Sequence, residues 1–129
     1  MINIKTFQRI EFLDVTVEIE SLVKKSAISE GICILFVPHT TAGITINENA
    51  DPSVKNDMRL KINKMVPCVE NYSHSEGNSD AHIKSSLFGY SLNLIISSGK
   101  LALGNWQGIY FCEFDGPRNR NLYVKFMAG

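Results

Sequence analysis

The segment SLNLIISSGKLALGNWQGIYFCEFDGPRNRNLYVKF, residues 91–126, decides the fold class, because it consists of strand-like stretches separated by short turns. Apolar and β-branched residues predict four strands, over 91–96, 100–106, 108–114 and 121–126. The residues SSG, a break near 107 and the residues DGPRN separate them. Consecutive strands with such short connections predict an antiparallel meander at this end of the chain.

The residues before this segment alternate between strand and helix patterns. The apolar run GICILFV, residues 31–37, predicts a buried strand, and GITIN, residues 43–47, alternates like a strand with one apolar face. Apolar residues repeating along one face predict an amphipathic helix over 19–27. Because strands and helices intermingle early and strands fill the rest, we predict the α+β class.

Two further helices are indicated by residues suited to helix ends. Asp51 is a suitable N-cap and Pro52 a suitable first residue of a helix. The apolar stripe of that helix consists of Val54, Met58, Ile62 and Met65. A shorter helix is predicted to begin at Ser79 or Asp80 and to stop at Gly89. The sequence therefore predicts about three helices.

Length and composition exclude several classes of protein. A chain of 129 residues predicts one domain, 1–129, large enough to bury a core without disulfides. Thirteen basic residues balance thirteen acidic ones, so no nucleic-acid partner is expected. No stretch approaches the roughly 20 apolar residues of a membrane span, and the first ten residues lack a signal-peptide core. We therefore expect a cytoplasmic protein without a membrane partner.

Two polar segments flank the strand at 43–47. His39 lies just beyond the preceding buried strand, beside Thr40 and Thr41, and strand ends often carry functional sites. The segment TINENAD places the carboxylates of Glu48 and Asp51 before the second helix. Asp51 has an alternative role as the cap of that helix, whereas Glu48 has no such structural explanation.

The nine residues HSEGNSDAH, 74–82, combine two imidazoles with a flexible loop that enters a helix. Backbone N–H groups around Gly77 and Asn78, with the helix dipole behind them, are suited to a phosphate or carboxylate. His74 and His82 are suited to binding a metal or transferring a proton. The alternative is an ordinary polar loop with two exposed histidines, since the spacing is no established zinc pattern.

The last polar segment is DGPR, residues 115–118, between two predicted strands. Its functional interpretation is a phosphate clamp, because the guanidinium of Arg118 can contact two phosphate oxygens at once. The alternative is a solvated turn. The three histidines of the chain all lie in these polar segments, which predicts that His39, His74 and His82 share one metal-binding or proton-transfer site.

Together, HTTAGITINENADP (39–52), HSEGNSDAHIKSSLFG (74–89) and LALGNWQGIYFCEFDGPR (101–118) resemble the YjbQ-type family, also called secondary thiamine-phosphate synthases. The likeness runs over nearly the whole chain. One departure is local: Asn105 stands where the family usually has threonine. The resemblance implies curved, mostly antiparallel sheets in a sandwich-like arrangement and a homotrimer. It also implies an activity that joins a hydroxymethylpyrimidine diphosphate to a thiazole phosphate, giving thiamine phosphate and pyrophosphate.

That chemistry agrees with the residue types present. Displacing pyrophosphate requires cations to neutralise the leaving group, typically Mg²⁺ together with Arg or backbone N–H donors. Glu48, Asp51 and Asp80 are candidate ligands for such a hard cation. Three histidines exceed what this reaction needs and suit a transition metal such as Zn²⁺ better than Mg²⁺. Metal-dependent hydrolysis of a phosphorylated metabolite is therefore a second hypothesis.

A third hypothesis is non-enzymatic: the trimer binds a phosphorylated or metal-bound small molecule without turnover. The sequence assigns roles to three groups of residues. The predicted catalytic residues are His74, Glu48 and Asp51; the predicted phosphate-binding residues are Thr40, Thr41, Gly77, Asn78 and Arg118; the predicted ligands of a divalent metal are His39, His74 and His82.

Overall fold

The computed structural model describes all 129 residues and contains eight strands and three helices. In chain order they are β1 (Ile2–Lys5), β2 (Glu11–Asp14), α1 (Thr16–Ser26), β3 (Gly31–Phe36), β4 (Ala42–Glu48), α2 (Pro52–Met65), α3 (Ser79–Phe88), β5 (Ser91–Ser97), β6 (Lys100–Leu101), β7 (Gln107–Glu113) and β8 (Asn119–Ala128). The prediction of an α+β chain with about three helices is confirmed.

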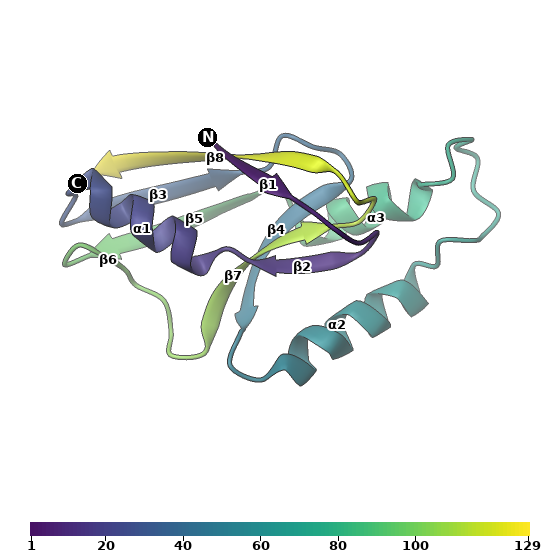
Figure 1. The fold of residues 1–129 in the computed structure, drawn as a ribbon, viewed down its shortest axis with the longest axis horizontal. Coiled ribbons are helices and arrows are strands. Elements are labelled where there is room, and N and C mark those ends of the chain that lie inside the picture. The colour runs from purple at the N-terminus through teal and green to yellow at the C-terminus, as the bar shows by residue number, and fades with distance from the viewer.

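The strands form two antiparallel sheets (Figure 1). The larger has the order β1-β8-β3-β5-β6 and the smaller has the order β2-β7-β4. The predicted C-terminal meander is wrong, because β7 pairs with β2 and β4 whereas β8 pairs with β1 and β3. Nearly all of β7 is buried, so it needs a partner strand on each edge, and the turn after it carries the chain across to the other sheet.

The predicted strand over 100–106 is also shorter in the structure. Only Lys100 and Leu101 pair with β5, after which the chain leaves the sheet. The backbone N–H of Gln107 donates to the carbonyl of Gly104, and the Gln107 side chain accepts from the Gly104 N–H. This local turn satisfies the backbone N–H groups of Gly104 and Gln107, which in a longer strand would need acceptors on a neighbouring strand.

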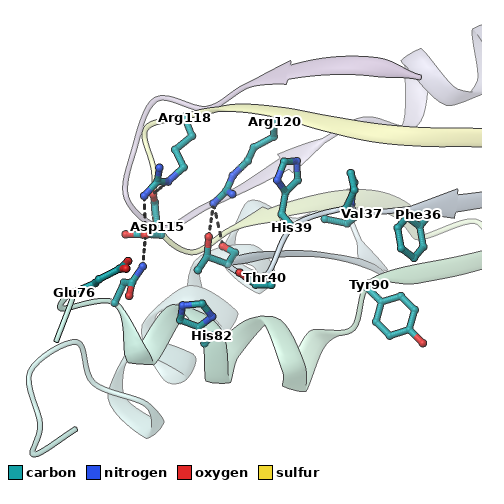
Figure 2. Close-up of a pocket in the computed structure, with 13 residues that line it drawn as sticks. Phe36, Val37, His39, Thr40, Glu76, His82, Tyr90, Asp115, Arg118 and Arg120 are labelled. Atoms are coloured by element: carbon teal, nitrogen blue, oxygen red, sulfur yellow. Dashed lines mark hydrogen bonds and ion pairs between the residues drawn. The ribbon is translucent and has the colours of Figure 1, made fainter. Parts of the chain in front are cut away.

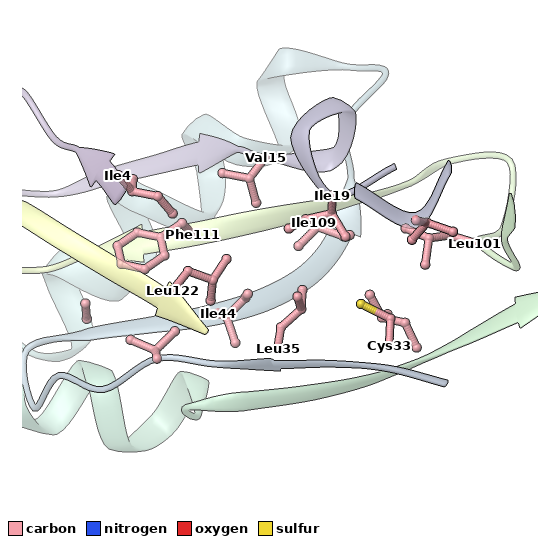
Figure 3. Close-up of a cluster of buried hydrophobic side chains, with 14 of the residues drawn as sticks. Ile4, Val15, Ile19, Cys33, Leu35, Ile44, Leu101, Ile109, Phe111 and Leu122 are labelled. Carbon is pink, nitrogen blue, oxygen red and sulfur yellow. The ribbon is translucent and has the colours of Figure 1, made fainter. Parts of the chain in front are cut away.

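The main core lies between the sheets and beneath α1 (Figure 3). Cys33 and Leu35 of β3 point into it, together with Ile19 of α1. The opposite face of β3 is not buried: Ile32 and Phe36 are each 42% exposed. The prediction that 31–37 is a buried strand therefore holds for one face only. On the other face an apolar stripe is open to solvent, comprising Ile32, Phe36, Ile95, Tyr123 and Met127.

The two predicted helix boundaries that rest on caps are confirmed. The Asp51 side chain accepts a hydrogen bond from the backbone N–H of Ser53 at 2.9 Å, and Pro52 begins α2. Helix α3 begins at Ser79 and ends before Gly89, whose positive φ of 96° suits a residue without a side chain. None of the helices combines the length and the apolar character that crossing a membrane requires.

Candidate functional site

A polar cavity of about 770 Å³ lies where the loop between β3 and β4, the start of α3 and the start of β8 meet (Figure 2). Its walls bring together three of the four polar segments that the sequence singled out. The lining residues with functional side chains are His39, Thr40, Thr41, Glu76, Asn78, His82, Asp115, Arg118 and Arg120. Segments far apart in the sequence therefore share one site.

His39 is held in one orientation by the backbone of β8. Its Nε2 atom accepts a hydrogen bond from the N–H of Asn121 at 2.9 Å. Burial lowers the pKa of the His39 imidazole, and the nearby charge of Arg120 lowers it further. The ring is therefore neutral near pH 7, and because Nε2 is the acceptor, the ring proton resides on Nδ1. His39 can thus donate a hydrogen bond from Nδ1, whereas Nε2 is not free to bind a metal.

Arg120 is a buried cation fixed from behind by a carboxylate. It pairs with Glu113 through Nε and Nη2, and Nη2 also donates to the Thr41 hydroxyl at 2.9 Å. Burial would raise the pKa of Glu113, but the hydrogen bonds from Arg120, the Asp115 N–H and Thr6, with the charge of Arg120, together outweigh it and the pKa is lowered. The remaining nitrogen, Nη1, takes no partner from the chain. The cavity wall therefore carries a preoriented guanidinium with an unused donor.

The Arg118 side chain is held by hydrogen bonds to Asp115 within the same turn. Its Nε donates to the Asp115 carbonyl at 2.8 Å and its Nη2 to the Asp115 carboxylate at 3.0 Å. The predicted clamp is thus partly occupied within the chain, and only the Nη1 side remains for a ligand. The side chain is half exposed, so the pair is a weak source of stability.

Asn78 joins this turn to the start of α3. Its amide nitrogen donates to the Asp115 carboxylate at 2.8 Å, which fixes the orientation of the amide. Its Oδ1 is buried without a partner. Gly77, in the left-handed region at φ 77°, shapes the same loop but does not line the cavity. Of the two predicted loop residues, the structure thus places Asn78 in the cavity wall and Gly77 beside it.

His82 lines the cavity, and His74, which does not line it, packs against the His82 ring. The two imidazole rings meet edge to face with centroids 5.4 Å apart, and His74 Nε2 lies 3.8 Å from a Glu76 carboxylate oxygen. His39 lines the same cavity from the β3–β4 loop. Within one chain, however, no three His, Cys, Asp or Glu side chains are close enough together to hold a metal ion. A single chain thus offers two adjacent imidazoles and lacks the third ligand of a zinc site.

Asp80 does not serve as a free cation ligand, contrary to the expectation from sequence. It is fully buried and accepts two hydrogen bonds from Arg9, at 2.8 and 3.0 Å, and one from Lys84 at 2.7 Å. Burial alone would raise the pKa of Asp80, but these partners lower it to about 2. The carboxylate is already neutralised, so its role is to fix α3 against the N-terminal loop.

Glu48 and Asp51 lie away from the cavity within one chain. Thr41 precedes β4 at the cavity, and β4 carries the chain away from it (Figure 1). Glu48 ends the strand seven residues later, a span of about 23 Å at the usual rise per strand residue. Asp51 caps α2 beyond it. The structure therefore does not bring these two predicted catalytic residues to the histidines of the same chain.

Arg120, Glu113 and Asp115 were not predicted as site residues. A signal for Arg120 exists, because residues two apart in an extended segment share a face, and Arg118 and Arg120 are so spaced. Glu113 has no such signal, because it was part of an apolar strand pattern and its partner lies on the other sheet.

The sequence and the fold both have close counterparts. The family model described as UPF0047 protein YjbQ-like matches residues 1–129. The UPF0047 protein MJ1081 of Methanocaldococcus jannaschii is 56% identical over 126 residues, covering 98% of this chain and 91% of that protein. The UPF0047 protein YugU of Bacillus subtilis is 50% identical, covering 98% and 97%.

Solved structures of similar proteins have the same fold. A YjbQ/UPF0047 family protein from Clostridium acetobutylicum superimposes with a TM-score of 0.95 at 52% identity, covering 98% of each chain. A YbjQ-like protein of unknown function from Sulfolobus solfataricus gives a TM-score of 0.95 at 33% identity, covering 99% of this chain and 94% of that one. With a full-length family match and relatives at half identity or more, the chain belongs to the YjbQ-like UPF0047 protein family.

Proposed function

We propose that the cavity binds a phosphorylated small molecule and that the protein is an enzyme acting on it. The observation that carries this proposal is the unused Nη1 donor of Arg120 on the cavity wall. Burying a guanidinium is costly, and here Glu113 and Thr41 hold it rigidly while leaving one donor free. A fixed cationic donor at a polar cavity suits the oxygens of a phosphate.

Three further donors support binding of an anion at the same place. The Nη1 side of Arg118, the hydroxyl of Thr40 and the Nδ1–H of His39 belong to residues of the same wall. Helix α3 also begins here, and its first N–H groups, at Ser79 and Asp80, have no intrahelical acceptor. Together they match the several oxygens of a diphosphate better than a single phosphate ester.

The activity to test first is formation of thiamine phosphate. The thiazole nitrogen attacks the pyrimidine's methylene carbon, a C–N bond forms, and the C–O bond to the diphosphate breaks with its electron pair on oxygen. Such a reaction needs little beyond orientation and neutralisation of the leaving group. Arg120 and Arg118 would neutralise the departing pyrophosphate, and His39 would donate a hydrogen bond to it.

The residues of this site suit Mg²⁺ bound together with the substrate's phosphates better than Zn²⁺ bound by three histidines. Mg²⁺ takes most of its ligands from water and substrate phosphates and needs only one or two carboxylates. Glu76 lines the cavity and could supply one, whereas Asp115 is engaged with Arg118 and Asn78. When bound, Mg²⁺ would neutralise charge on the diphosphate. A three-histidine Zn²⁺ site lacks its third ligand within one chain.

We also propose that the working form is the homotrimer that the family resemblance implies. The solvent-exposed apolar stripe on the five-stranded sheet supports an assembly, because a monomer gains nothing from leaving such side chains in water. Both sheets are open, so their outer strands also present unpaired backbone edges to a neighbour.

The proposal is tested by binding and turnover together. Titration calorimetry with inorganic pyrophosphate, with and without Mg²⁺, should give saturable binding with one site per chain. Incubation with the pyrimidine diphosphate and thiazole phosphate should then yield thiamine phosphate, detected by fluorescence after oxidation. Pyrophosphate binding without turnover of any phosphorylated compound would favour the non-enzymatic hypothesis, and absence of binding would contradict the proposed function.

A further inference from the structure

The C-terminal end of β4, at Glu48, presents an ordered surface that forms no part of the cavity of the same chain. The backbone there is fixed: the Tyr110 hydroxyl donates to the Glu48 carbonyl at 3.2 Å, and the Asn49 N–H donates to the Trp106 carbonyl at 3.0 Å. Asn49 is also tied down, because its side chain donates to the Asp14 carboxylate at 3.0 Å, but two side chains of this fixed backbone are free. The Glu48 carboxylate has no partner in the chain, and the Trp106 side chain is 64% exposed.

The mouth of the cavity carries exposed aromatic rings, which are suited to contact an exposed aromatic side chain such as Trp106. Phe36 and Tyr90 line the cavity, and Tyr123 lies beside Phe36, with ring centroids 5.7 Å apart for Phe36 and Tyr90 and 6.5 Å apart for Phe36 and Tyr123. All three rings are open to solvent, and the apolar stripe of the five-stranded sheet continues from them. Exposed aromatic clusters of this kind are typical anchoring points of protein interfaces.

The end of β4 and the aromatic cluster lie on different parts of the chain, so they can meet only between two copies. A closed ring of three copies places one surface of each copy against a different surface of the next. The groups left unpaired favour the same pairing, because Glu48 at the end of β4 keeps a free carboxylate, while Arg118 and Arg120 at the cavity each keep a free Nη1 donor.

We infer that Trp106 of one copy packs on the cluster of Phe36, Tyr90 and Tyr123 of the next copy, so that Glu48 closes that neighbour's cavity. The site is then composed of two chains. Glu48 becomes the carboxylate beside the histidines that the sequence predicted, supplied by the neighbour. The inference rests on the proposed anion-binding role of the cavity only for the function of Glu48, and the contact of Trp106 can be tested without it.

Trp106 is the sole tryptophan, so its fluorescence reports this contact directly. In the assembled protein we expect blue-shifted emission and at least a threefold reduction in acrylamide quenching relative to the unfolded chain. Tyr90→Ala should restore red-shifted emission, whereas Leu60→Ala, a change to an exposed residue of α2, should not. An assembled protein of the correct mass whose Trp106 is quenched as strongly as in the unfolded chain would overturn the inference.

Mixing two defective variants separates a shared site from a site within one chain. Arg118→Ala impairs the cavity half, and Trp106→Ala with Glu48→Gln impairs the other half. In calorimetry with Mg²⁺, each alone should lose most pyrophosphate binding, because Arg118 contacts the anion and the Glu48 carboxylate would hold the cation beside it. Co-refolded mixtures should regain about a quarter of the wild-type sites, because random neighbours pair two intact halves that often. Wild-type binding by the Trp106→Ala, Glu48→Gln variant, or no recovery on mixing, would contradict a shared site. If the wild-type protein binds no pyrophosphate, the proposed function fails and the fluorescence result alone decides the inference.

Discussion

The Nε2 atom of His39 lies 2.9 Å from the backbone nitrogen of Asn121 and accepts its hydrogen bond. This contact fixes the imidazole next to Arg120, so that a proton added to the ring would be both buried and repelled (Figure 2). The neutral form with a proton on Nδ1 is the one that can donate to a phosphate oxygen.

The first prediction concerns the titration of this ring. Because burial and Arg120 lower the pKa of His39 below its usual value near 6.5, the neutral ring should predominate in the folded protein at pH 6.5. Its contribution to stability is present above the unfolded pKa and is lost as pH falls through the lowered pKa. Nitrogen-15 NMR should show an Nδ1-protonated tautomer, and a pKa above 6.5 would contradict the geometry. His39→Ala assigns the signal.

Arg118→Lys should weaken pyrophosphate binding even though the charge is kept. Lysine cannot donate to Asp115 and to a ligand with the same fixed fork, so the affinity should fall about tenfold. Arg59→Lys, on α2 and outside the cavity wall, is the matched control and should bind like the wild-type protein. Unchanged affinity in Arg118→Lys would indicate that the turn is a structural feature alone.

Asp80→Asn should destabilise the fold without removing a ligand-binding group. It would leave the buried Lys84 without its carboxylate partner, a loss of about 3–5 kcal/mol in the free energy of unfolding. Asp57→Asn, at an exposed position of α2, should change stability by less than about 0.5 kcal/mol. Adding Lys84→Met to Asp80→Asn should recover part of the loss, and denaturant melts measure all four proteins.

The same carboxylate predicts how stability depends on acid. Its pKa falls from 3.8 to about 2 on folding, so its stabilising effect is complete above about pH 5 and is lost progressively as pH falls through 2. The difference corresponds to about 2 kcal/mol. Wild-type melts between pH 5 and 2 should show this loss, whereas Asp80→Asn should show a flatter profile over the same range. Equal slopes in both proteins would contradict the assigned ion pairs.

Local signals in the sequence were sufficient for the ends of α2 and α3, whereas α1 begins at Thr16, three residues before the predicted range 19–27, and its N-cap Val15 makes no side-chain cap bond. The Asp51 cap, Pro52 and Gly89 act within one turn of the chain, so their structural effect is visible in the order of residues. Strand pairing depends on distant partners instead. The hydrophobic pattern of β7 predicted a strand, but not that its neighbours would be β2 and β4 rather than the adjacent β6 and β8.

The site was predictable to the extent that its residues stand in polar segments. His39, His82, Asn78 and Arg118 lie in one cavity as their residue types indicated. Asp80 was assigned to a cation, because its partner Arg9 lies 71 residues away and no spacing rule connects them. Glu48 lies about 23 Å along β4 from the cavity, and one chain alone provides no role for its carboxylate.

The most direct test of an anion-binding cavity is a crystal structure of the protein grown with millimolar pyrophosphate and Mg²⁺. We predict one diphosphate in the cavity, with an oxygen within hydrogen-bond distance of Arg120 Nη1 and another near Arg118. A cavity that contains only water at pyrophosphate concentrations that saturate binding in solution, with the anion located elsewhere, would contradict the account.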